Sequence, residues 1–328
     1  MSASNTPQVA NKKQWEGVSV IANPSLSPAA PTSDAVSKSP KPSPAGRAPR
    51  MALDDEDLPT HVNDKSMLAT LPTECLSGNP RRPLRHVDDK GNEYFYSLKP
   101  MLFSVALILV VELFERFSFY GIFYTQTLYL TGVYNEDWNA GLTSVDAASF
   151  VSWSTAVAFT TPFVGAILSD TVWGEYYSIL IGAFGFYLPG ILLVTLTSVP
   201  YLLGDTFNTF ALSVSILFLW PLGTGMVKSV VNVFGAKQFH PILQSSMIER
   251  YYVTFYTAIN SGALAGIIIV PIIAQHNVTI AYCLPWCLLT IGVTIFLLAP
   301  PRYVMSKPRG DLRKQSPPLN ASNCGGVD

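Results

Sequence analysis

A stretch of 200 residues, 101–300, carries only 13 of the 43 Asp, Glu, Lys and Arg residues in this chain of 328. Ordinary soluble domains are about one-quarter charged, so a stretch of this composition could not keep a soluble protein dissolved. Its apolar residues fall into six runs, each close to the roughly 20 residues that cross a bilayer as an α-helix. We therefore predict an all-α membrane protein joined to a separate polar segment.

The six apolar runs predict how the chain is divided. Gly and Pro lie inside several of these runs, and membrane helices tolerate both. Pro300 and Pro301 close the last run. We expect a transmembrane bundle over residues 96–301, with spans at residues 101–131, 146–168, 177–199, 206–229, 251–274 and 279–299.

Polar segments precede and follow the predicted bundle. The first 100 residues contain 13 of the 25 prolines, together with many serines and small charged clusters. Such a segment buries too little apolar surface to offset the entropy cost of ordering. We therefore predict a disordered cytoplasmic tail over residues 1–95 and a second cytoplasmic tail over residues 302–328.

The basic residues next to the spans predict the orientation, because cytoplasmic loops carry an excess of Lys and Arg. Basic residues precede the first span, separate the fourth from the fifth and follow the sixth. The loops at 134–145, 200–205 and 275–278 contain none. We expect both termini in the cytoplasm, no cleaved signal peptide in the first 30 residues, and a plasma or endosomal/vacuolar membrane.

Composition excludes several other classes of protein. The net charge is −1 and no basic block is present, which argues against a nucleic-acid binder. Cys283 and Cys287 lie in an apolar run without His or carboxylate partners, which favours packing over metal binding. No catalytic triad or metal constellation can be assembled. We expect a protein that is not an enzyme and uses no cofactor other than a proton gradient.

Three charges lie inside the first predicted span. Glu112, Glu115 and Arg116 are spaced i, i+3 and i+4, which places them on one helical face, and Lys228 lies near the end of the fourth span. Each such charge costs about 2.5–3.5 kcal/mol at the centre of a membrane helix unless it is paired. One alternative is a set of structural ion pairs. We favour the hypothesis that Glu112 and Glu115 form a proton site.

The fourth span contains the segment GTGMVKS, from Gly223 to Ser229. Its spacing does not match a phosphate-binding loop, and it lies in an apolar run. Close helix packing at Gly223 and Gly225 is the better interpretation.

Four segments of the chain resemble one family. Residues 112–121 read ELFERFSFYG, which is similar to the E-x-x-E-R-F-x-Y-Y-G signature of the proton-dependent oligopeptide transporter family, a branch of the major facilitator superfamily. Residues 165–174, 223–239 and 255–264 resemble the loop between helices two and three, the helix-four segment and the helix-five signature of that family. The resemblance implies the N-terminal six-helix bundle of a major facilitator fold.

The family resemblance implies roles for particular residues. It assigns proton coupling to the helix-one charges and to the helix-four lysine, which are Glu112, Glu115, Arg116 and Lys228. Tyr120 and Asn260 match positions that line the peptide site. Arg116 and Lys228 are also suited to hold the terminal carboxylate of a peptide by charge-assisted hydrogen bonds.

The sequence also departs from the family pattern at four positions. Phe119 replaces the first tyrosine of the signature, and Phe123 stands where some members carry a substrate-binding arginine. Glu175 replaces an arginine and Lys237 replaces an aspartate. Because the last two changes look like an exchange of charge, we predict a Glu175–Lys237 ion pair.

The expected activity is proton-coupled symport of di- and tripeptides. Family members consist of two six-helix halves with the substrate between them, so the expected partners are a small peptide, protons, the lipid bilayer, and a second copy or a missing C-terminal half. One alternative is a non-transporting interaction or regulatory subunit, or a truncated product. A second is a carrier of nitrate or another small anion.

Overall fold

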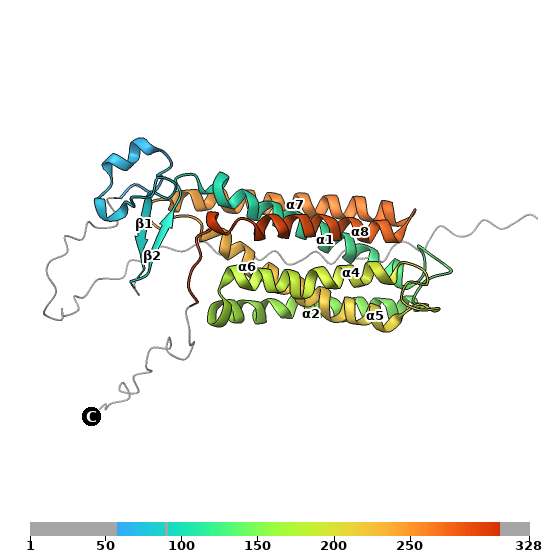
Figure 1. Cartoon of the computed structure of the whole chain (residues 1–328). Helices are drawn as coiled ribbons and strands as arrows, with labels where there is room; N and C mark the ends of the chain where they lie inside the picture. Colours follow the sequence, from blue (N-terminus) through green and yellow to red (C-terminus); the bar gives the residue numbers. More distant parts are fainter. Residues whose placement is uncertain (1–57, 89–90, 309–328) are drawn as a thin grey trace, which may run out of the picture. The chain divides into compact units, whose positions relative to one another are not determined.

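The computed structural model describes residues 58–88 and 91–308. Most of them form long helices that run back and forth through one bundle (Figure 1). The spans α7 Ser245–Ala274 and α8 Val278–Leu297 are single helices throughout. The other four include short π-helical segments: Met101–Val105 leading into α1 Ala106–Leu130; α2 Ser144–Leu168 and π-helical Ser169–Trp173; α3 Glu175–Leu180, π-helical Ile181–Tyr187 and α4 Leu188–Thr197; and α5 Thr209–Ser213, π-helical Val214–Leu219 and α6 Trp220–Ala236.

All six predicted spans correspond to helical segments. In the described residues, five of these segments are long and apolar enough to cross a membrane. The segment containing α1 is not among the five, although it is as long as the others, because Glu112, Glu115 and Arg116 interrupt its apolar sequence. The helix α7 begins at Ser245 rather than at residue 251, because a polar turn continues it beyond the apolar run.

Proline explains why two spans change helical geometry in the middle. Pro189 lies at the start of α4 and Pro221 at the start of α6, and each directly follows a π-helical segment. A proline ring clashes with the carbonyl group four residues earlier, so the preceding turn of an α-helix must widen. The wider turn at 181–187 places Tyr187 on the buried side of its span.

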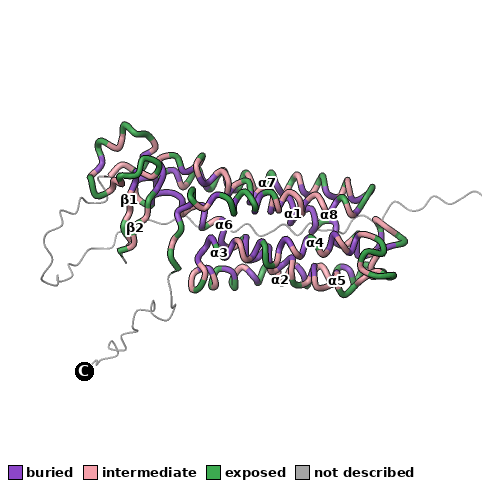
Figure 2. The backbone as a smooth tube through the Cα atoms, viewed as in Figure 1, coloured by how far each residue is buried: buried purple, intermediate pink, exposed green. Residues whose placement is uncertain are grey.

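The helices form two layers. The helices α1, α7 and α8 lie side by side in one layer, and α2 and α6 lie in the other together with the segment from α3 to α4 (Figure 1). Exposed positions recur along α2 and α7, which carry large exposed apolar side chains such as Trp153, Phe163 and Leu264 (Figure 2).

Glycines allow α1 and α7 to approach closely. A Cβ atom at Gly262 would lie 2.3 Å from the Leu113 carbonyl oxygen, and one at Gly266 would lie 2.4 Å from the Phe117 carbonyl oxygen. Such distances leave no room for any larger residue. The backbone of α7 therefore rests directly on α1, on the same stretch of α1 that carries the charged residues.

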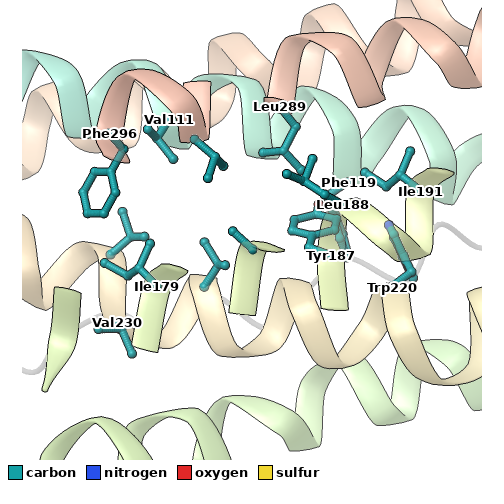
Figure 3. Packing of buried hydrophobic residues seen from close by; sticks show 14 of the residues in the cluster. Val111, Phe119, Ile179, Tyr187, Leu188, Ile191, Trp220, Val230, Leu289 and Phe296 are labelled. Carbon is teal, nitrogen blue, oxygen red and sulfur yellow. The ribbon is translucent and has the colours of Figure 1, made fainter. Parts of the chain in front are cut away.

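The apolar core lies between the two layers. Phe119 of α1 faces Tyr187, Leu188 and Trp220 across this space (Figure 3). Tyr187 and Trp220 are among the largest fully buried side chains of the described residues. Because these contacts join helices that are far apart in the sequence, the core fixes the position of α1 against α6.

The structure corrects the predicted tail. Residues 58–88 and 91–98 are ordered: 3-10 helices Lys65–Thr70 and Thr73–Cys75 are followed by β1 Leu84–Val87, which pairs antiparallel with β2 Glu93–Tyr96. The prediction of disorder over residues 1–95 is wrong for residues 58–88 and 91–95, and residues 1–57 and 89–90 lie outside the described part. The second predicted tail is also partly packed, because Tyr303 and Val304 are buried; residues 309–328 lie outside the described part.

A small second core holds the hairpin against the bundle. Its buried members come from the hairpin region, the α6–α7 loop and the segment after α8: Val62, Leu71, Leu84, Tyr96, Leu243 and Val304. The Gln244 amide nitrogen donates to the carbonyl oxygens of Val62 and Ser97, both at 3.0 Å. Local runs of apolar residues are too short here to predict order, because the burial comes from three separate parts of the chain. We call this end of the bundle the hairpin end.

Candidate functional site

Three charged side chains of α1 form a buried group, which we call the α1 cluster: Glu112, Glu115 and Arg116. Their exposed fractions are 3%, 0% and 2%. Arg116 Nε lies 3.2 Å from Glu112 Oε1, and the Arg116 guanidinium group also pairs with Glu115 Oε2. The spacing in the sequence correctly placed these three residues together. The cluster holds two carboxylates against one guanidinium group, in a setting where unpaired charge is costly.

An aromatic stack positions the arginine. The Arg116 guanidinium carbon lies 5.3 Å from the centroid of the Phe119 ring, which is a cation–π distance. The Phe119 ring in turn stacks on Trp220 and on Phe123, with centroids 5.1 Å and 5.9 Å away. Phe119 and Phe123 are two of the departures from the family signature. In this chain they build one continuous stack that supports Arg116.

Two hydroxyl groups from the opposite layer reach Glu115, and the sequence analysis missed both. Thr224 Oγ1 of α6 donates a hydrogen bond to Glu115 Oε1 at 2.7 Å, and Tyr187 Oη donates to the Glu115 carbonyl oxygen at 3.4 Å. Both side chains are fully buried. Each oxygen of the Glu115 carboxylate therefore has a partner. The only signal in the sequence was a threonine placed between two glycines in an apolar span.

The two glycines beside Thr224 are packing positions, as predicted. A Cβ atom at Gly223 would lie 2.3 Å from the Tyr187 backbone nitrogen, and one at Gly225 would lie 2.5 Å from Thr161 Cβ of α2. On one side the backbone of α6 therefore rests against the π-helical segment 181–187, and on another side against α2. This close packing fixes the height and rotation at which Thr224 faces Glu115.

Lys228 stands apart from the α1 cluster. It is exposed, and within the described residues it makes no ion pair; its Nζ atom lies 5.2 Å from the centroid of the Phe159 ring of α2. No ion pair therefore joins Lys228 directly to the α1 cluster within the described residues. Lys228 is nevertheless close enough to interact electrostatically with all three members of the α1 cluster. The positive charge of Lys228 would balance the second carboxylate of the α1 cluster, which Arg116 alone does not neutralise.

The other two predicted site residues lie on the accessible side of the bundle. Tyr120 is half-buried, with its ring edge-on to Phe119 at 5.2 Å and stacked on Tyr124 at 6.4 Å. Asn260 of α7 is exposed, and its side chain makes no hydrogen bond within the part of the chain that the structure describes. Lys228, Tyr120 and Asn260 thus remain accessible, whereas the α1 cluster is enclosed.

Comparison with known proteins finds a family match over part of the chain. Residues 176–320 match the family model PTR2, which describes the POT family. The match agrees with the family resemblance of the sequence, and it includes α6 with Thr224 and Lys228 and α7 with Asn260.

Proteins similar to this chain include solute carrier family 15 member 2 of Rattus norvegicus, which is 29% identical over 258 residues. That alignment covers 76% of this chain and 34% of the relative. Peptide transporter family 1 of Drosophila melanogaster is 32% identical over 219 residues, covering 64% of this chain and 28% of the relative. The chain therefore spans about a third of the length of the curated relatives it matches.

Solved structures show the same fold. A peptide transporter POT in complex with sulfate superimposes with a TM-score of 0.55 at 22% identity, covering 65% of this chain and 40% of the other. The POT-family transporter PepTSo gives a TM-score of 0.53 at 22% identity, covering 63% and 39%. The likeness confirms an all-α membrane fold of this type for the chain.

The predicted Glu175–Lys237 ion pair is present in the structure. Lys237 Nζ at the end of α6 donates to Glu175 Oε1 at the start of α3. Ser306 joins them: it donates to Glu175 Oε2, and Lys237 Nζ donates to Ser306 Oγ at 3.3 Å. We call Glu175 and Lys237 the end pair. Together with Ser306, it ties α3, the end of α6 and the segment after α8 to one another at the hairpin end, away from the α1 cluster.

Proposed function

We propose that this chain supplies the proton-coupling half of a carrier for di- and tripeptides. The observation that carries the proposal is the α1 cluster, in which two carboxylates and one guanidinium group are enclosed within apolar helices. Buried charge of this kind is rare inside a membrane and marks ion pathways and proton relays. The names of the curated relatives, which describe peptide transporters, support the same function.

Within the proposal, the excess negative charge is what responds to protons. Two carboxylates and one guanidinium group sum to −1, and either a proton or the approach of Lys228 would neutralise the cluster. Glu112 is the better proton acceptor, because its described partner is the ion pair with Arg116, whereas both oxygens of Glu115 are occupied. Protonation of Glu112 would weaken its ion pair with Arg116. It would also neutralise the cluster, so that Lys228 is not needed for charge balance and can bind a substrate.

The accessible residues supply the substrate side. Lys228 is exposed and unpaired within the described residues, so it is the cation best placed to hold a peptide carboxylate. Arg116 was also predicted for this role, but its burial between two carboxylates makes it a partner of the proton site in this conformation. Tyr120 and Asn260 would line the same surface.

The remaining parts of the proposal concern placement in the membrane. Lys and Arg flank the helices at the hairpin end, which favours the cytoplasmic side for that end and for both termini. A plasma or endosomal/vacuolar membrane fits this arrangement. Six further helices, from the same polypeptide or a second copy, would complete the peptide site; the greater length of the matched relatives supports this.

Uptake by reconstituted protein tests the proposal. The chain is incorporated into liposomes, and uptake of a labelled dipeptide is measured with and without an inward proton gradient. We expect uptake that depends on the gradient, is abolished by Glu112→Gln and is retained in Glu249→Gln, which removes an exposed carboxylate of α7. Gradient-driven uptake that survives in a Glu112→Gln, Glu115→Gln double variant would contradict the proposed proton site.

A second candidate function is that of a non-transporting membrane subunit. The large exposed apolar side chains of α2 and α7, such as Trp153, Phe163 and Leu264, favour contacts with other helices. Correctly inserted protein without uptake, together with stable association with a full-length relative, would favour this function. Uptake of labelled nitrate in place of the dipeptide would instead favour an anion carrier of the same family.

A further inference from the structure

The hydroxyl group of Thr224 is used differently from those of three other buried threonines of the bundle. Thr161, Thr195 and Thr125 each donate to the carbonyl oxygen four residues earlier in their own helix, at 2.7–2.8 Å. Such local bonding is the usual way for a threonine to satisfy its hydroxyl group inside a helix. Thr224 donates instead across the layers to Glu115 Oε1.

The packing around Thr224 leaves its side chain a fixed direction. Gly223 and Gly225 bring the α6 backbone against two neighbouring segments, and Thr224 itself is 0% exposed. The hydroxyl group therefore cannot turn to water, and it lies beside a carboxylate whose other oxygen pairs with Arg116. A hydroxyl group that donates to a carboxylate stabilises the ionised form more than the protonated form.

We propose that Thr224 is a positioning residue that keeps Glu115 ionised against Arg116, so that Glu112 is the member of the α1 cluster that exchanges protons. This inference rests on the proposed function for its meaning, but the hydrogen bond itself can be tested without transport. Glu115 then acts as a permanent counter-ion that holds Arg116 in place. Glu112 remains the variable charge.

The other charged and titratable groups near the cluster are consistent with this division. From α1 itself come Glu112 and Arg116, and from α6 comes Lys228, which interacts at a distance. The segment 181–187 contributes Tyr187, whose hydroxyl group donates to the Glu115 backbone, and α7 contributes Tyr251. The only charged residue of α2 is Asp146, which lies in its first turn, and α8 has no charged residue. Thr224 is thus the neutral group that distinguishes one carboxylate from the other.

The test is an infrared titration of the reconstituted chain, which follows the carbonyl stretching band of protonated carboxyl groups as the pH falls. In the wild-type protein we expect a titrating band that disappears in Glu112→Gln and persists in Glu115→Gln. Thr224→Val keeps the shape of the side chain but removes the donor. It should add a second band that is absent from the wild type and that disappears when Glu115→Gln is added.

Control variants separate this role from a general effect on folding. Thr224→Ser restores the hydroxyl group and should return the wild-type titration. Thr195→Val makes the same change at a buried threonine that bonds only within its own helix, and it should leave the titration unchanged. If Thr224→Val does not fold, Thr224→Ala serves as a smaller variant without the donor.

The outcomes distinguish this inference from the proposed function. A new band that depends on Glu115 in Thr224→Val supports the positioning role, whether or not the chain transports peptide. Identical titrations of the wild type and of the hydroxyl-free variants overturn it, even if gradient-driven uptake is observed. Conversely, a wild-type protein without any band that depends on Glu112 or Glu115 removes the proposed proton site, while the comparison of Thr224→Val with Thr224→Ser still decides the role of Thr224.

Discussion

The α1 cluster and the end pair are two charged networks in one chain, and they are built in opposite ways. All three members of the α1 cluster lie within five consecutive residues of one helix, and their charges do not balance. The end pair joins α3 to α6 with one charge of each sign, and Lys237 is partly open to solvent. A balanced pair between distant segments holds the fold together. An unbalanced cluster within one helix adds little to the fold but can gain or lose a proton.

Replacing Arg116 should have the largest effect. Arg116→Leu leaves two buried carboxylates without a counter-ion, which should lower the free energy of unfolding by about 3–5 kcal/mol. Thermal unfolding in detergent measures this, with Arg250→Leu at an exposed position of α7 as the control. Adding Glu115→Gln to Arg116→Leu should recover part of the loss. Equal effects of the Arg116 and Arg250 variants would mean that the cluster is not enclosed as described.

Filling the glycine contact beside Thr224 should have the next largest effect. A Cβ atom at Gly223 would lie 2.3 Å from the Tyr187 backbone nitrogen, so Gly223→Ala should cost about 1–3 kcal/mol. Gly185→Ala is the matched control, because its nearest neighbour would be 3.9 Å away. Thermal unfolding and uptake measured on the same preparations show whether α6 must approach this closely. Wild-type stability in Gly223→Ala would contradict the close contact.

The end pair predicts a smaller coupling energy. Glu175→Gln and Lys237→Gln should each destabilise the protein, and a double-mutant cycle should give a coupling of about 1 kcal/mol, because Lys237 is 32% exposed. The exchanged pair Glu175→Lys, Lys237→Glu should recover stability relative to either reversal alone. Neither network should affect the titration of the other, so a change in the infrared band of the α1 cluster in these variants would break the distinction between the two.

His240 provides the smallest predicted effect, a dependence of stability on pH at the hairpin end. Burial beside His86 and Tyr96 lowers the pKa of His240 from about 6.5 to about 4, and its Nδ1 atom accepts from the Leu243 backbone at 3.1 Å. Between these values the unfolded chain binds a proton that the folded chain does not. Stability should therefore fall as the pH drops from about 6.5 toward 4, and it should be fully present above about 6.5.

Thermal unfolding between pH 7 and pH 5 measures the effect, which should be on the order of 1 kcal/mol. His240→Gln should flatten the dependence, whereas His276→Gln at an exposed position at the opposite end of the bundle should not. If the stability of His240→Gln depends on pH as the wild type does, other titratable side chains cause the dependence. The α1 cluster would then be examined first.

Much of the candidate site could be predicted from the sequence because its members are near neighbours along one helix. The spacing of Glu112, Glu115 and Arg116 places them on one face whatever packs against it. The Glu175–Lys237 pair could be predicted because two substitutions exchanged their charges. Lys228 could not be placed in the same way. Its distance from the cluster depends on how far α6 is rotated against α1, which no local pattern records.

The sequence by itself determined the membrane-spanning helices, the resemblance to a family and the composition of the α1 cluster. These follow from the length of apolar runs, from the helical repeat and from local motifs, all of which act over a few turns. Only the tertiary structure decided that Thr224 bonds to Glu115, that Lys228 stands exposed, and that residues 58–88 and 91–98 are ordered. Each of these depends on contacts between segments far apart in the chain, and the free energy of such contacts is set by packing that no single segment contains.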